Sequence, residues 1–269
     1  MPELPEVETT MRGIEPYVCG QVIKRFIVRD NRLRWPVASE TASLPGHRIE
    51  NLSRRGKYIL MQLDCGTLIW HLGMSGSMKI RPAGSPIESH EHIEVELASG
   101  YALKFRDPRR FGALLYTESD PLTHPLLEKL GPEPLSAAFD GKYLYSACRK
   151  RSAAIKSVIM DSRRVAGVGN IYASEALFSA GINPARAAGR ISKKRLDRLV
   201  IAIKETLQAA ILQGGTTLKD FTQVDGNPGY FGHRLNVYGV KGPCPVCGKP
   251  VKQSRQGQRS TYFCPQCQT

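Results

Sequence analysis

The chain begins Met1-Pro2-Glu3-Leu4-Pro5-Glu6-Val7-Glu8, a stretch that predicts both a helix and an unusual chemical group at its start. Apolar residues follow Leu4 at spacings of three and four, which predicts a helix over 4–17 with one buried face. If Met1 is removed, Pro2 carries a free secondary amine, a potential nucleophile beside a carboxyl that can carry protons. The plainer interpretation is an ordinary helix entry, because proline and carboxylates both suit a first helical turn.

The composition favours a polyanionic partner. The 269 residues include 38 Lys+Arg against 24 Asp+Glu, a formal net charge of +14. Nucleic acid is the leading partner class, and an anionic membrane surface is the weaker alternative. No apolar run approaches the roughly 18 residues of a spanning helix, and the acidic start lacks the basic and apolar regions of a signal peptide. We therefore expect a cytoplasmic protein with no membrane association.

The pattern of apolar residues divides the chain into a β-rich part and a helical part. Short, alternating segments separated by turn residues predict strands at Val22–Val28, Tyr58–Leu63, Thr67–Leu72, Ser77–Arg81, Ile93–Leu97, Ala102–Phe105 and Ala113–Tyr116. Four prolines and a glycine over 121–135 predict a linker. Helices are then predicted at Asp140–Lys150, Ala154–Met160, Ile171–Ala180 and Ser192–Gln213. The segment Thr216–Gly232 shows the apolar period of neither a strand nor a helix and is a predicted functional loop.

Four of the seven cysteines form a pattern typical of a zinc ribbon. Cys244-x2-Cys247 and Cys264-x2-Cys267 stand sixteen residues apart, which suits two knuckles joined by a β-hairpin over 249–263. Four protein ligands leave no open position, so we expect one structural Zn2+; a redox pair is the poorer alternative. The hairpin carries cations that can contact phosphates or form a solvated surface: Lys252, Arg255 and Arg259. The scattered Cys19, Cys65 and Cys148 are expected to be small core residues.

Three further stretches are candidates for nucleic-acid contact. Residues 165–171, with two glycines and Asn170 before a helix, can bind phosphate or form an ordinary turn. The loops Leu72–Gly76 and Asp107–Gly112 present Met74, Arg109 and Phe111, which suit wedges in an opened base stack, with core packing as the alternative for Met74 and Phe111.

Lys57 and His90 are candidates with less local support. Lys57 follows a basic turn and can exchange protons or contact a phosphate. His90-Glu91-His92 makes a weak case for a metal site, because the histidines are alternate strand residues with no third ligand nearby, so a phosphate contact by His90 is preferred.

Together these motifs resemble the formamidopyrimidine-DNA glycosylase family, over essentially the whole chain. The resemblance rests on Pro-Glu-Leu-Pro-Glu, Arg-Gly-Lys-Tyr, Leu-Gly-Met-Ser-Gly, Asp-Pro-Arg-Arg-Phe-Gly, Val-Gly-Asn-Ile-Tyr-Ala-Ser-Glu, Gly-Gly-Thr-Thr-Leu-Lys-Asp and the four-cysteine ribbon. It implies an α+β fold: an N-terminal β-sandwich with a flanking helix, a helix-two-turns-helix domain and a zinc ribbon, with DNA in the cleft between them. The expected boundaries are 1–120 for the sandwich, 121–134 for the linker, 135–232 for the helical domain with a lesion loop at 216–232, and 233–269 for the ribbon.

The resemblance also implies an activity and roles for residues. The expected enzyme acts as a monomer on damaged double-stranded DNA in a bacterial cytoplasm, at the nucleoid. It removes oxidised purines through a Schiff base and then cuts the strand by β,δ-elimination. The catalytic residues implied are Pro2, Glu3, Lys57 and Arg259. The DNA-binding residues implied are His90, Arg109, Lys150, Asn170, Met74 and Phe111. Glu6 and Glu175 match carboxylates of the inner cleft, and their roles stay open.

Two alternatives remain. The sister enzyme endonuclease VIII shares the fold and the terminal Pro-Glu but prefers oxidised pyrimidines; Leu4 and the intact Arg109-Arg110-Phe111 loop resemble the purine enzyme more. A non-catalytic DNA-binding protein would explain the charge and the zinc equally well. It would not need the Pro2-Glu3 pair with Lys57.

Overall fold

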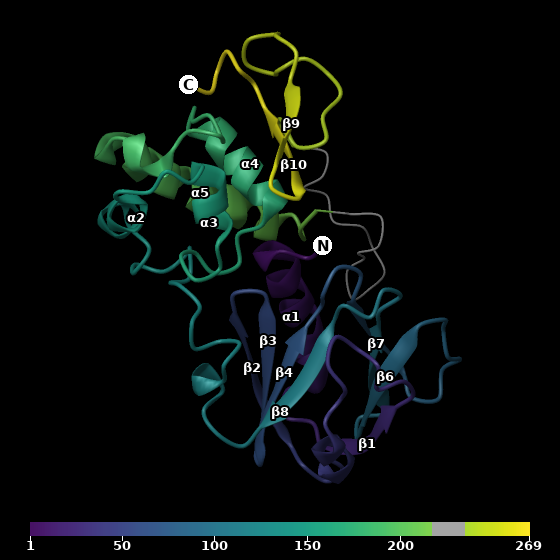
Figure 1. Ribbon diagram of the computed structural model, residues 1–269. Coiled ribbons are helices and arrows are strands. Elements are labelled where there is room, and N and C mark those ends of the chain that lie inside the picture. The colour runs from purple at the N-terminus through teal and green to yellow at the C-terminus, as the bar shows by residue number, and fades with distance from the viewer. Residues whose placement is uncertain (217–234) are drawn as a thin grey trace. The chain divides into compact units, whose positions relative to one another are not determined.

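The computed structural model describes residues 1–216 and 235–269. The chain forms two compact units (Figure 1). Of the described residues, the first unit holds 1–128 and 213–216, and the second holds 129–212 and 235–269. Within these described ranges, the helices are too short or too polar to cross a membrane.

In its described residues, the first unit contains an α-helix and two four-stranded antiparallel sheets (Figure 1). The helix α1 spans Leu4–Val18. One sheet has the order β1-β6-β7-β5 and the other β2-β3-β4-β8. The strands are β1 Ile23–Val28, β2 Ile49–Arg55, β3 Tyr58–Leu63, β4 Gly66–His71, β5 Ser77–Pro82, β6 Glu91–Leu97, β7 Tyr101–Arg106 and β8 Ala113–Thr117. Two short 3-10 helices, η1 Ser39–Ser43 and η2 Pro121–Thr123, also lie in the described part of this unit.

A single apolar core joins α1 to both sheets. Trp70 of β4 and Phe105 of β7 come from different sheets, and their ring centroids lie 5.5 Å apart. Val7 and Ile14, on the predicted stripe of α1, are at most 1% exposed within the same core. Each such side chain stabilises the fold by about 1.5–3 kcal/mol through burial. The expected β-sandwich with a flanking N-terminal helix is confirmed.

One strand was not predicted from the sequence. β2 pairs with β3 along its whole length, but the register shifts between Ile49 and Asn51. This irregularity breaks the two-residue alternation, so the buried residues Ile49 and Leu52 stand three apart. A β-bulge therefore conceals the strand from a test based on alternation.

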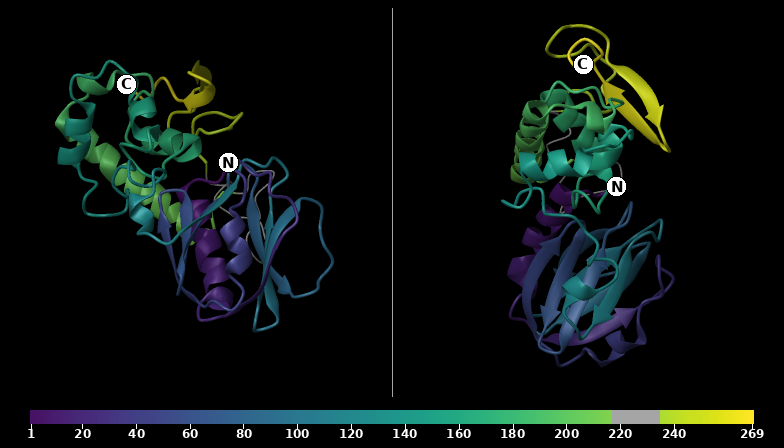
Figure 2. Two further views of the ribbon diagram at one scale, coloured as in Figure 1. Left: turned by 60° about the horizontal axis from the view of Figure 1, so that its bottom comes forward. Right: turned by 60° about the vertical axis from the view of Figure 1, so that its left-hand side comes forward.

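The second unit combines a helical part with a β-hairpin (Figure 2). Its helices are α2 Gly141–Cys148, α3 Ile155–Met160, α4 Asn170–Ser179 and α5 Lys193–Leu212, with the 3-10 helix η3 at Ala188–Arg190. The hairpin pairs β9 Lys252–Gln256 with β10 Arg259–Phe263. α4 packs against α5 and against β10. The predicted loop over 216–232 lies outside the described residues from 217 onward.

Candidate functional site

The start of the chain is held in place by Glu6. Pro2 and Glu3 are buried, and Glu3 is 2% exposed. The Glu6 carboxylate, itself 0% exposed, accepts a hydrogen bond from the Glu3 backbone N–H at 2.8 Å and another from Thr216 N–H at 2.8 Å. Glu6 therefore fixes the backbone of the Pro2-Glu3 segment, which gives a structural role to a carboxylate whose role the sequence left open.

Lys57, in the turn between β2 and β3, lies near a histidine that stays neutral. His71, at the end of β4, is half-buried, and its Nδ1 accepts a hydrogen bond from Gly73 N–H at 3.2 Å. Burial, followed by the positive charges of Lys57 and Arg34, lowers the pKa of His71 to about 4. An accepting Nδ1 requires the neutral ring, so the geometry and the pKa agree.

His71 should make the sandwich less stable in mild acid. Its folded pKa of about 4 lies below the unfolded value of about 6.5, so its contribution is present above pH 6.5 and is lost as the pH falls towards 4. Between pH 7 and pH 5 this loss amounts to about 2 kcal/mol of the free energy of unfolding. Urea denaturation of wild type and His71→Asn at both pH values checks this, and the variant should lack that part of the dependence.

The matched control is His90→Asn, because His90 is an exposed histidine in the same unit. The free energy of unfolding of this control should change with pH as that of the wild-type protein does. If the free energies of unfolding of wild type and His71→Asn change with pH in parallel, His71 is not the neutral histidine that causes the loss in acid.

The two predicted wedge loops place their key side chains at the surface. Met74 is 36% exposed and Phe111 is 46% exposed. The Arg109 guanidinium lies over the Phe111 ring, 5.1 Å from its centroid. The alternative of core packing for Met74 and Phe111 is therefore wrong.

A buried carboxylate joins these two loops. Asp107 is 0% exposed and accepts hydrogen bonds from Ser75 Oγ and from Gly112 N–H, both at 2.7 Å. Arg109 N–H in turn donates to Ser75 Oγ at 3.1 Å. At Gly73, where φ is +64°, a side-chain carbon would meet the Phe111 backbone at 2.3 Å, so only glycine allows this approach. The exposed Met74, Arg109 and Phe111 thus stand on one rigid support.

Backbone strain coincides with the predicted DNA contacts. The non-glycine residues in the left-handed region, among those described, are His90 (φ 68°), Arg110 (φ 54°) and Lys150 (φ 56°). Strained residues of this kind cost about 1–3 kcal/mol each and gather at functional sites. His90 and Lys150 are exposed, whereas the Arg110 side chain pairs with Asp30 at 2.7 Å and so supports the loop that carries Arg109.

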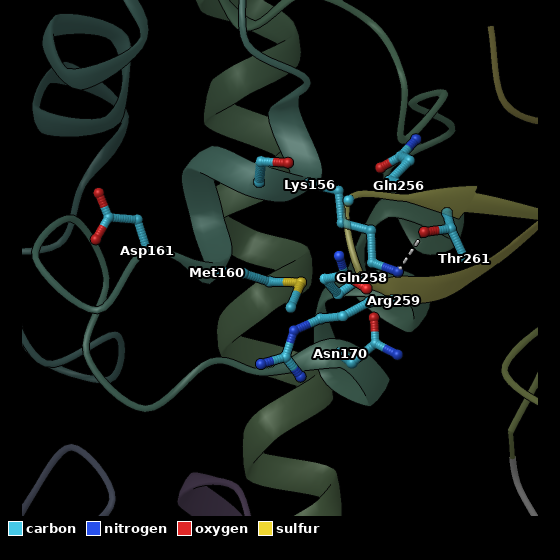
Figure 3. Close-up of a pocket in the computed structure, with 10 residues that line it drawn as sticks. Lys156, Met160, Asp161, Asn170, Gln256, Gln258, Arg259 and Thr261 are labelled. Carbon is cyan, nitrogen blue, oxygen red and sulfur yellow. Dashed lines mark hydrogen bonds between the residues drawn. The ribbon is translucent and has the colours of Figure 1, made fainter.

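A polar pocket of about 290 Å³ in the second unit brings together Asn170 and Arg259 (Figure 3). Asn170, at the start of α4, donates from Nδ2 to the Ser260 carbonyl at 3.0 Å. Its Oδ1 is buried and has no partner among the described residues. Lys156, only 2% exposed, donates to Thr261 Oγ1 at 2.9 Å and to Ser260 O at 3.3 Å. Lys156 and Asn170 therefore attach the hairpin that carries Arg259 to the helices.

Glu175 stabilises another part of this unit. Its buried carboxylate accepts hydrogen bonds from the backbone N–H groups of Asn236, Val237 and Tyr238 at 2.8–3.0 Å, and from Asn236 Nδ2 at 3.1 Å. The segment so fixed places the Tyr238 ring 5.1 Å from Tyr262 of β10. Glu175 thus fixes the backbone near the pocket, and this is a structural role for the second carboxylate whose role the sequence left open.

The four cysteines of the tail fit a zinc ion. The Sγ atoms of Cys244, Cys247, Cys264 and Cys267 all lie within 4.8 Å of one another. Two of the separations are 3.8 Å (Cys244 to Cys267) and 3.5 Å (Cys247 to Cys264). Sulfurs about 2.3 Å from a tetrahedral Zn2+ are about 3.8 Å apart, whereas a disulfide needs about 2.05 Å. The donor set and its spacing suit one structural Zn2+.

The structure adds residues that the sequence patterns did not single out: His71, Ser75, Asp107 and Lys156. Each is a polar side chain beside a predicted site residue; Ser75, Asp107 and Lys156 are buried, and His71 is half-buried. The available signal was weak: Ser75 and Asp107 lie inside the two wedge-loop motifs, and Lys156 is a lysine within an apolar helical stretch.

Comparison with known proteins gives a consistent result over the whole chain. Family models match residues 1–114 (formamidopyrimidine-DNA glycosylase N-terminal domain), 130–222 (the H2TH domain of the same glycosylase) and 241–269 (zinc finger found in FPG and IleRS). Formamidopyrimidine-DNA glycosylase of Idiomarina loihiensis is 56% identical over 269 residues, covering 100% of both chains. That of Pseudomonas aeruginosa is 55% identical over 270 residues, again covering 100% of both chains.

Solved structures agree with the sequence relatives. The crystal structure of the MutM (Fpg) protein from Thermus thermophilus has a TM-score of 0.89 at 41% identity, and the match covers 99% of this chain and 98% of that one. A Lactococcus lactis Fpg mutant in complex with Fapy-dG-containing DNA has a TM-score of 0.92 at 33% identity, with 99% of each chain covered. On these grounds the chain belongs to the formamidopyrimidine-DNA glycosylase family.

Proposed function

We propose that this chain is a bifunctional DNA glycosylase and abasic-site lyase of base excision repair, which removes oxidised purines such as 8-oxoguanine and formamidopyrimidines from duplex DNA. The observation that carries the proposal is the buried Pro2-Glu3 segment, fixed by Glu6 at the start of α1. A binding protein has no need for a terminal amine held in one position beside a carboxyl group. Membership of the family supports the same activity.

Pro2 is the proposed nucleophile. After removal of Met1, its nitrogen attacks C1′ of the damaged nucleotide, and the bond between C1′ and the base breaks. Glu3 supplies the proton needed for this cleavage. Because Pro2 is a secondary amine, opening of the sugar ring leaves a positively charged iminium, which draws electrons from the neighbouring carbon.

Strand cleavage follows from the iminium. Its charge makes the hydrogen on C2′ acidic, so C2′ loses a proton and the 3′ phosphate leaves by β-elimination. Lys57 is the proposed proton donor in this step. A second, δ-elimination releases the 5′ phosphate, and Arg259 is its proposed acid. The products are a one-nucleotide gap and a sugar fragment that is released from Pro2 by water.

The remaining site residues are proposed to hold the DNA. Lys57, Asn170 and Arg259 bind phosphates around the extruded nucleotide, and the Arg259 guanidinium in the lining of the polar pocket suits such an anion. His90 and Lys150 bind further phosphates. Met74, Arg109 and Phe111 fill the space that the extruded base leaves, with Arg109 facing the orphaned base. The domain boundaries at 1–120, 121–134, 135–232 and 233–269, and a monomer acting on cytoplasmic, nucleoid DNA, belong to the same proposal.

Covalent trapping tests the chemistry directly. Borohydride reduces an iminium to a stable amine, so zinc-loaded enzyme mixed with 8-oxoguanine duplex should yield a protein–DNA adduct at Pro2, located by peptide mass spectrometry. Absence of an adduct from a preparation whose Met1 is removed would favour the non-catalytic DNA-binding alternative. Faster cleavage of a thymine glycol duplex than of an 8-oxoguanine duplex would instead show a preference for oxidised pyrimidines, as in endonuclease VIII.

Arg109→Ala should relax the choice of the base opposite the lesion. Arg109 is exposed and stacked on Phe111, so its guanidinium is free to contact the orphaned base. A good side-chain contact to a base supplies about 1–3 kcal/mol of discrimination, so the preference for cytosine over adenine should fall by roughly 5- to 150-fold. Single-turnover rates on duplexes that differ only in the opposite base measure this.

Lys24→Ala is the matched control, because Lys24 is an exposed cation on β1 of the same unit. It removes one positive charge without touching the wedge loops, so its preference for the opposite base should match wild type. An unchanged preference in Arg109→Ala would show that Arg109 does not recognise the base opposite the lesion.

A further inference from the structure

We propose a second metal site, an exchangeable Zn2+ site in the first unit formed by His47, Asp64 and Cys65. One ligand atom from each of the three residues lies within 4.8 Å of the others. The site is separate from the four-cysteine ribbon, which belongs to the second unit. It draws on the three ligand types that Zn2+ accepts from proteins: imidazole nitrogen, carboxylate oxygen and thiolate sulfur.

The backbone brings the three residues together. Asp64 and Cys65 form the two-residue turn between β3 and β4, where Leu63 pairs with Gly66. His47 precedes β2, and its own backbone is fixed: its N–H donates to Leu44 O at 3.1 Å and its carbonyl accepts from Ile23 N–H at 2.9 Å. The ligands therefore stand on a hairpin and an adjoining anchored segment, which limits the entropy lost when a metal binds.

Neighbouring groups orient the ligands in the way that outer contacts do at metal sites. Asp64 Oδ2 accepts a hydrogen bond from Arg48 N–H at 3.1 Å, while Oδ1 lies 2.7 Å from His47 Nδ1. Tyr116 donates from its hydroxyl to the Cys65 carbonyl at 2.7 Å. The Arg48 guanidinium donates to Gly20 O at 2.8 Å, so the arginine is anchored elsewhere.

The spacing is close to that of a bound ion. Ligand atoms about 2.0–2.3 Å from a tetrahedral Zn2+ lie roughly 3.3–3.7 Å apart, so the side chains need to move by only about 1 Å. An ion pair between His47 and Asp64 explains the cluster less well than a metal site does. His47 and Asp64 side chains are 40% and 42% exposed, and exposed pairs contribute at most about 1 kcal/mol to stability. Three protein ligands leave the fourth position to water, which makes this ion exchangeable, unlike the ribbon's ion.

The test uses full-length protein without an affinity tag, with one Zn2+ per chain confirmed by elemental analysis. Calorimetric titration with Zn2+ should show a second equivalent. His47→Ala and Cys65→Ser should each weaken that second equivalent at least tenfold, since even an outer contact to a metal ligand is worth about 10–100-fold in affinity. The matched controls His124→Ala and Cys19→Ser, half-buried residues of the same unit, should retain it.

A second measurement needs no variant. Added Zn2+ should slow alkylation of Cys65 by iodoacetamide in the wild-type protein, measured by peptide mass spectrometry, and leave the rate at Cys19 unchanged. A wild-type protein that takes up no second equivalent overturns the proposal. So does a second equivalent that survives in both His47→Ala and Cys65→Ser, or equal alkylation of Cys65 with and without Zn2+.

Discussion

A preparation in which one extra residue stays attached in front of Pro2 should lose base release by roughly 10³-fold or more, together with all covalent trapping. The reason is that the proline nitrogen then lies in a peptide bond, where resonance withdraws its lone pair. Intact mass spectrometry establishes the extension, and single-turnover cleavage of an 8-oxoguanine duplex measures the loss. The proposed role of Pro2 predicts this loss, whereas the fold alone does not.

Pro2→Gly separates the chemistry from a steric effect of the extension. Its terminus carries a primary amine in place of the secondary one, and this amine also forms an imine. The variant should therefore be trapped by borohydride and should cleave faster than the extended chain. Pro16→Ala, at an exposed position of the same helix, should cleave at the wild-type rate. Full activity in a chain shown by mass to keep its extension would refute the role of Pro2.

The arrangement of this site explains why a small amine can be an effective catalyst. Pro2 and Glu3 are buried, and Glu6 holds the Glu3 N–H at 2.8 Å while it also binds Thr216. Fixing a nucleophile in this way avoids the loss of freedom that a mobile terminus would suffer at the transition state. The helix α1, which carries Glu6, therefore also positions the reactive group.

Local patterns predicted those elements whose signal lies within one segment. α1, α5 and most strands agree with the predicted ranges to within one or two residues, because each carries its own period of apolar residues. β2 was missed because its bulge removes the alternation. The predicted hairpin of 249–263 contains both β9 and β10, since paired cysteines and turn residues mark its ends.

The supporting contacts of the site could not be predicted in the same way. Lys156 meets Thr261 across 105 positions of sequence, and Glu175 meets Asn236 across 61. No local period records such a pairing, since it depends on how separate elements pack. Asp107 shows the same limit: its motif was visible, but its bond to Ser75 across 32 positions was not. Reactive residues can thus be identified in the sequence by their type and motif, whereas the residues that hold them in place can be identified only from the fold.

Cys247→Ser should unfold the zinc hairpin and greatly weaken DNA binding while the sandwich stays folded. Structural zinc supplies about 10–16 kcal/mol of folding free energy in small zinc domains, so loss of one thiolate ligand removes the basis of the hairpin. Three of its contacts to the helical part would go with it: Lys156 to Thr261, Asn170 to Ser260 and Gln268 to the Ile182 carbonyl. The cations Lys252, Arg255 and Arg259 would no longer be held in place.

The measured quantities are the Kd for an abasic-analogue duplex and its dependence on salt. Each phosphate contact contributes about 0.9 to the slope of log K against log salt, so loss of three cations should reduce the slope by up to about 3. Cys19→Ser, which changes a half-buried cysteine of the sandwich, should leave both quantities unchanged. Wild-type affinity and slope in zinc-free Cys247→Ser would show that the hairpin does not bind DNA, because the charge remains in the chain and only its fixed position is lost.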